Sequence, residues 1–201
     1  MRHSLLASAL AVSLLLTAQA GRATEAGLDI KLAHESDAER QTAAQLGRLL
    51  QTYDVSRWTV TRDVIIDEKT IPHSDPVLTL HARHLKDDDL LLSTFVHEQM
   101  HWWLSTHRLQ AEAVMAELRR LFPKIPVGYP EGSSDPVTNY AHLIIIYLEY
   151  RADQTLMGEL RAHAVMQFWA GDHYRWLYRE LLRDPEKIGV IVKKHGLLPP
   201  A

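Results

Sequence analysis

The chain has 201 residues, with 22 lysines and arginines against 25 aspartates and glutamates, for a formal net charge of −3. Such mild acidity provides no positive field for a phosphate backbone, so nucleic acid is not an expected partner. Cysteine is absent, which excludes disulfides, thiolate metal ligands and cysteine nucleophiles, whereas histidine is abundant, with 12 residues.

Residues 1–20 have the three-part layout of a secretory signal peptide. A basic start is followed by an apolar run over 5–16 and by a small-x-small ending at 18–20. The apolar run of about twelve residues is shorter than the roughly 20 that a membrane span needs, although an uncleaved anchor is the alternative. We therefore expect a signal peptide over 1–20 and a single domain over 21–201. We also expect no membrane span in the mature chain, and export to the periplasm or beyond the cell.

The first part of the mature chain predicts one helix and two strands. Ser36 and Glu39 have the spacing of a capping box that opens a helix. Residues 58–66 are rich in Val, Ile and Thr and alternate well enough for a strand. Residues 77–82 indicate a second strand, which the opening Pro76 places at a sheet edge.

The remainder of the chain predicts helices. Three aspartates at 87–89 crowd a helix start, where the helix dipole favours negative charge. Pro123 ends a further amphipathic helix, and a loop follows to residue 136. Asp135 and Pro136 then form a good N-cap and first turn for a helix that extends to Gly158, and later breaks are expected near 171 and 185. The fold class we expect is α+β and helix-dominated, with a small N-terminal β-sheet and a C-terminal helical part.

His97, Glu98 and His101 form the metal-binding motif H-E-x-x-H. On a helix the two histidines differ by about 40° of rotation, so both can contact one Zn²⁺ ion from the same side. Glu98 is rotated by about 100° from His97 and can reach a water bound to that ion, whose pKa zinc lowers to about 7. The motif predicts a helix with a zinc site and Glu98 as general base. The alternative is a pair of ordinary histidines beside a solvated glutamate.

Three residues compete to be the third metal ligand. His107 has the metzincin spacing, but Leu104 replaces the glycine of that motif, and on a continuous helix His107 points about 240° away from His101. His142 and Glu149 share a later helix but lie about 10.5 Å apart along its axis. We therefore expect one ion to bind only one of these two.

Glu149 and Asp153 stand one helical turn apart, downstream of H-E-x-x-H. This Glu-x-x-x-Asp pattern resembles the gluzincins, the thermolysin-like zinc metallopeptidases, over about residues 90–158. The resemblance implies a compact zincin-like fold in which a strand at 77–81 binds the substrate main chain. It also implies that Glu149 is the third zinc ligand. Asp153 would then accept a hydrogen bond from the other ring nitrogen of a ligand histidine. His142 would then line the cleft and donate a hydrogen bond to the oxyanion.

The motifs together predict an exported zinc-dependent metallopeptidase, a hydrolase that cleaves peptide bonds in a peptide or protein substrate. The alternatives are a catalytically inactive zincin-like binding module and a metal-binding protein of the cell envelope. Glu98 separates them, because hydrolysis needs a carboxylate between the two histidines and a binding site does not. The sequence leaves the oligomeric state open.

Overall fold

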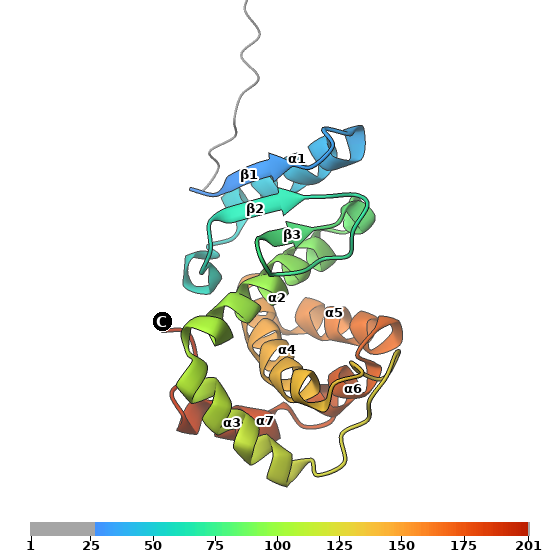
Figure 1. The fold of residues 1–201 in the computed structure, drawn as a ribbon. Coiled ribbons are helices and arrows are strands. Elements are labelled where there is room, and N and C mark those ends of the chain that lie inside the picture. Colours follow the sequence, from blue (N-terminus) through green and yellow to red (C-terminus); the bar gives the residue numbers. More distant parts are fainter. Residues whose placement is uncertain (1–26, 201) are drawn as a thin grey trace, which may run out of the picture.

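The structure, a computed structural model, describes residues 27–200, so the signal peptide expected at 1–20 lies outside the described residues. A small parallel sheet and one helix lie at one end of the molecule and most helices lie at the other, with helix α2 running between them (Figure 1). The described part of the chain is dominated by helices, as the sequence predicts. The strands are β1 (Asp29–Leu32), β2 (Asp63–Ile66) and β3 (Leu78–Leu80).

The helices follow the chain in a simple order. Helix α1 (Asp37–Thr52) packs beside the sheet, and two short 3₁₀ helices, η1 and η2, precede the long helix α2. The remaining helices form the other end of the molecule. Their bounds are η1 Ser56–Trp58, η2 Ala82–His84, α2 Asp88–Thr106, α3 Arg108–Leu121, α4 Pro136–Met157, α5 Glu159–Asp172, α6 Arg175–Arg183 and α7 Pro185–Lys194.

Helix α1 begins where the capping box predicts. The hydroxyl of Ser36 accepts a hydrogen bond from the amide of Glu39 at 3.2 Å. The carboxylate of Glu39 accepts from the amides of His34 and Glu68, at 2.8 and 3.2 Å, and so joins the helix start to the segments that follow β1 and β2.

The sheet differs from the prediction in its strands. Its order is β1-β2-β3, all parallel, and β1 has no counterpart among the predicted strands. The strand predicted at 58–66 is confined to 63–66. Trp58 ends η1 and is buried in the core, and residues 59–62 form no regular structure.

Strand β3 lies at the sheet edge, as Pro76 predicts, but its outer edge is already occupied in part. Thr79 and His73 exchange two backbone hydrogen bonds, at 2.7 and 3.1 Å, as an antiparallel bridge. The expectation that 77–81 offers a free edge to a substrate is therefore wrong at Thr79. The segment 71–74 covers that edge at Thr79.

Helices α2 and α4 form the centre of the molecule. Residues 90–100 of α2 are all buried, and α4 carries buried side chains on every face. Burying a polar group in such a helix costs free energy unless the group finds a hydrogen-bond partner. The partners of the buried histidines and carboxylates of α2 and α4 therefore need an explanation. Within 27–200 no helix is both long and apolar enough to cross a membrane.

Candidate metal centre

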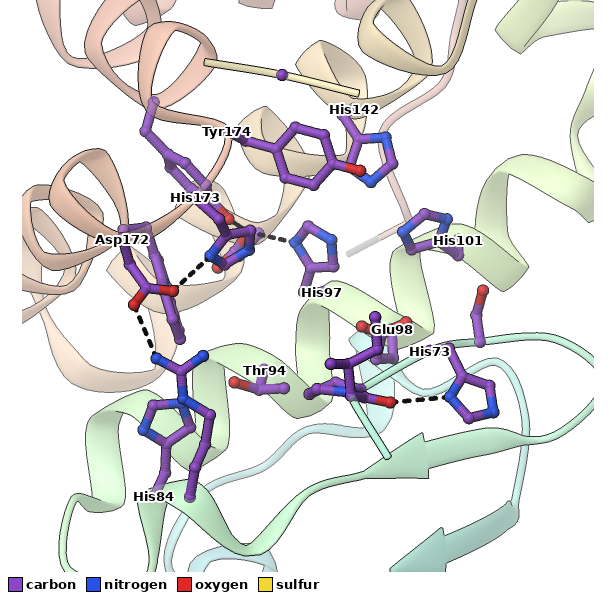
Figure 2. A pocket seen from close by; sticks show the side chains of 18 of the residues that line it. His73, His84, Thr94, His97, Glu98, His101, His142, Asp172, His173 and Tyr174 are labelled. Atoms are coloured by element: carbon purple, nitrogen blue, oxygen red, sulfur yellow. Dashed lines mark hydrogen bonds and ion pairs between the residues drawn. The ribbon is translucent and has the colours of Figure 1, made fainter. Parts of the chain in front are cut away.

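Three histidines from two helices converge on one point. His97 and His101 lie one turn apart on α2, and His142 faces them from α4 (Figure 2). One ring nitrogen from each lies within 4.8 Å of the other two. The ring centroids are 4.9 to 5.7 Å apart.

The three rings are neutral at pH 7. Burial lowers the pKa of His97 to about 3, that of His101 to about 2 and that of His142 to about 3, and neighbouring histidines add to the effect. The Nδ1 of His142 lies 2.8 Å from the carbonyl oxygen of Thr138, which can only accept. A neutral imidazole that donates from Nδ1 keeps its lone pair at Nε2, which is the form that binds a metal ion.

Glu149 lies behind His97, fully buried, and only accepts hydrogen bonds. Its oxygens receive the hydroxyl of Ser93 at 2.6 Å, the hydroxyl of Tyr178 at 3.0 Å and the Nδ1 of His97 at 2.8 Å. Burial raises the pKa of Glu149 to about 7, and the two hydroxyl donors act against that rise. Since His97 is neutral, its contact with Glu149 is a hydrogen bond that fixes the tautomer and orientation of the ring.

This geometry places His142, and not Glu149, with His97 and His101. Because α2 and α4 run antiparallel, His142 lies opposite His101, whereas Glu149 lies opposite Ser93. Glu149 thus occupies the supporting position that the thermolysin-like resemblance implies for Asp153.

Asp153 itself makes no hydrogen bond to a histidine. It is fully buried one turn beyond Glu149, and burial together with the charge of Glu149 raises the pKa of Asp153 well above its usual value. His107 is also outside the group. It follows α2 and stacks on Trp103 with ring centroids 3.6 Å apart.

Glu98 lies beside the three histidines, and no other described side chain forms a hydrogen bond with its carboxylate. It is 5 % exposed and lines the same cleft. Burial, with a smaller effect of Glu149, raises the pKa of Glu98 to about 8. The motif geometry expected from the sequence, with Glu98 flanking His97 and His101, is therefore present (Figure 2).

The histidines line a cleft of about 580 Å³. Its lining comes from the segment 71–74, η2, α2, the α3–α4 loop, α4 and the junction of α5 with α6. The indole Nε1 of Trp102 donates to the carbonyl of Ser74 at 2.9 Å, which holds the segment 71–74 against α2.

The junction of α5 and α6 brings three further residues into the cleft. Asp172 accepts from Nδ1 of His173 and from Nη2 of Arg83, both at 2.8 Å. Tyr174 has left-handed backbone angles, φ 47° and ψ 36°, and its ring stacks on His142 with centroids 4.2 Å apart. A non-glycine residue held in this region of backbone space stores strain, which proteins concentrate at functional sites.

Asp172, His173, Tyr174 and Tyr178 are not among the site residues expected from the sequence. Tyr178 is buried, but its hydroxyl bonds Glu149, and Tyr174 faces the cleft. The helix break expected near residue 171 is the local sequence feature that coincides with this junction.

Comparison of the chain with protein-family models, with curated proteins and with solved structures finds no match.

Proposed function

We propose that this protein is an exported zinc metallopeptidase, a hydrolase of peptide bonds, with His97, His101 and His142 as the metal ligands. The observation that carries the proposal is the convergence of three neutral imidazoles beside the unpartnered carboxylate of Glu98 on the wall of a cleft. Export rests on the signal peptide expected from residues 1–20.

The donor set fits zinc. Catalytic zinc sites use three protein ligands, often histidines, and leave a further position open. Glu149 and the carbonyl of Thr138 hold two of the three rings from behind, in the manner typical of metal-binding histidines. When bound, zinc polarises a carbonyl group and lowers the pKa of a coordinated water to about 7.

The chain itself supplies a base and a hydrogen-bond donor. A cation held by the histidines would lower the pKa of Glu98 from about 8, and its carboxylate then takes a proton from water and later returns it to the leaving amine. The hydroxyl of Tyr174, whose ring stacks on His142 in the cleft, donates to the carbonyl oxygen as negative charge develops on it. Donation to the oxyanion is the role expected from the sequence for His142. In this proposal Tyr174 has that role and His142 is the third ligand.

Three histidine ligands set this proposal apart from the gluzincin arrangement. The thermolysin-like resemblance assigns a glutamate as third ligand, whereas Glu149 is engaged by three donors behind His97. What remains of the resemblance is the H-E-x-x-H helix and a second helix that carries acidic residues toward it.

The substitution Glu98→Gln tests the proposal. It retains the volume of the side chain but removes the proton acceptor, so we expect a zinc content equal to that of the wild type and a fall in turnover of about 10²- to 10⁴-fold. Zinc is measured in the purified protein, and cleavage is followed by mass spectrometry on a defined mixture of peptides. Glu112→Gln, at an exposed glutamate of α3 paired with Arg108, is the matched control.

Two results would contradict the proposal. A Glu98→Gln protein as active as the wild type would remove the proposed base. A wild-type protein that holds zinc but cleaves no peptide would instead favour a zincin-like binding module or a metal-binding protein of the cell envelope.

A further inference from the structure

Arg83 places unused hydrogen-bond donors in the cleft. It belongs to η2 and lines the cleft, with its side chain 41 % exposed. A guanidinium group has five N–H donors. Among the described residues, one of its nitrogens, Nη2, bonds Asp172, and the other two have no partner. Each of these free nitrogens can donate a charge-assisted hydrogen bond to a carboxylate oxygen.

Asp172, the partner of Arg83, already accepts a hydrogen bond at each of its oxygens. One oxygen accepts from Arg83 and the other from His173. A substrate ammonium group would have to share one of these oxygens with its present donor and would lie close to the positive charge of Arg83. A carboxylate can bind the free nitrogens of Arg83 and leave both hydrogen bonds in place. The pair therefore favours an anionic group of the substrate over a cationic one.

Two exposed apolar side chains also line the cleft. They are Ile71 and Tyr129, which come from two different loops and are 78 % and 82 % exposed. Apolar surface that a ligand covers is removed from water, so these two side chains can contribute to binding. Figure 2 places Asp172 and His173 on one side of His97, and His73, from the same loop as Ile71, on the opposite side.

We propose that Arg83 binds a carboxylate of the substrate and that an apolar part of the same substrate contacts Ile71 and Tyr129. The inference rests on the proposed peptidase function and deepens it by naming the substrate class. The substrate is a short apolar peptide whose carboxylate, at the chain end or on an acidic side chain, lies on the Asp172 side of the histidines.

Peptide binding to zinc-supplied Glu98→Gln protein, measured by titration calorimetry, tests this inference. The probes are acetyl-Leu-Leu-Leu with a free carboxylate, the same peptide as its amide, and acetyl-Leu-Leu-Glu amide. We expect the free acid to bind about tenfold more tightly than its amide. Adding Arg83→Gln reduces the affinity for the free acid to that of the amide. If the glutamate amide binds like the free acid, the carboxylate comes from a side chain; if it binds like the amide, the site recognises a chain end.

Arg161→Gln is the matched control, because Arg161 forms an ion pair with Asp89 outside the cleft. This variant should keep the preference for the free acid. Equal affinity for acid and amide in the Glu98→Gln protein would overturn the inference, as would a preference that survives Arg83→Gln. If the wild type cleaves peptides without any acid preference, this inference alone fails. If binding depends on Arg83 but no peptide is cleaved, the carboxylate site stands and the peptidase function fails.

Discussion

A single buried carboxylate decides how the proposed metal site is built. Glu149 receives hydrogen bonds from His97, Ser93 and Tyr178 and offers both of its oxygens as acceptors. Replacing it by glutamine turns one acceptor into a donor that faces other donors, so His97 loses the bond that orients its ring. We expect Glu149→Gln to weaken zinc binding about 10- to 100-fold, measured by competition with a chromophoric chelator, whereas His142→Ala abolishes stoichiometric binding.

Glu180→Gln is the control for this prediction, since Glu180 is a buried carboxylate of α6 that pairs with Arg183, away from the histidines. Its substitution should leave zinc affinity at the wild-type value. If Glu149→Gln removed zinc completely while His142→Ala retained it, Glu149 would be the ligand after all, as the thermolysin-like resemblance implies.

At the scale of the elements, the contact between α4 and α7 depends on the absence of a side chain. A Cβ atom at Gly189 of α7 would lie 2.5 Å from the hydroxyl of Tyr147, which is fully buried in α4. Because neither helix can move without disturbing the core, we expect Gly189→Ala to lower the free energy of unfolding by about 1–3 kcal/mol, measured by urea denaturation.

The control is Gly171→Ala in α5, where a Cβ atom would meet nothing within 4 Å. Alanine favours a helix by about 0.5–1 kcal/mol over glycine, so this variant should be as stable as the wild type or more stable. Similar losses from both substitutions would show that the helix ends, and not the contact with Tyr147, determine the effect.

Elements with strong local signals were predictable from the sequence. Ser36 and Asp135 cap α1 and α4 where expected, because a cap is a contact between residues two or three positions apart. The strands were less predictable. A four-residue strand such as β1 carries too few side chains for its alternation to be recognised, and Trp58 is equally apolar in a strand or a 3₁₀ turn.

The same distinction applies to the site. The spacing of His97 and His101 is local and indicates a metal site by itself. The choice between His142 and Glu149 depends on which turn of α4 lies against α2, which the sequence does not encode locally. The pair of Arg83 and Asp172, separated by 89 positions, becomes visible only when η2 and α5 lie opposite each other.

At the scale of the whole molecule, η2 links the sheet end to the helical end through His84. The ring of His84 contacts the edges of Trp169 and Phe168 on α5, with centroids 5.4 and 6.1 Å apart. Its carbonyl accepts a hydrogen bond from Gln45 of α1 at 3.1 Å. The residue therefore holds together parts of the chain that lie on either side of α2.

Burial lowers the pKa of His84 from 6.5 to about 4, which makes this link sensitive to acid. Among the charged neighbours, Arg83 and His81 lower the pKa further, while Asp87 and Asp172 raise it. Between pH 6.5 and 4 the unfolded chain binds a proton at this position that the folded chain does not. The contribution of neutral His84 to stability is thus complete above about pH 6.5 and is lost as the pH falls toward 4.

We expect the wild type to lose about 2 kcal/mol more free energy of unfolding between pH 7 and pH 4 than His84→Gln, whose side chain stays neutral. The figure is below the full linkage value because solvent in the cleft screens part of the charge. Urea denaturation with a chelator present measures the difference. His97, His101 and His142 titrate in both proteins, so their contributions cancel. His163→Gln, at an exposed position of α5, should follow the wild type at every pH. If His84→Gln lost stability in acid as steeply as the wild type, the link through η2 would not depend on a neutral His84.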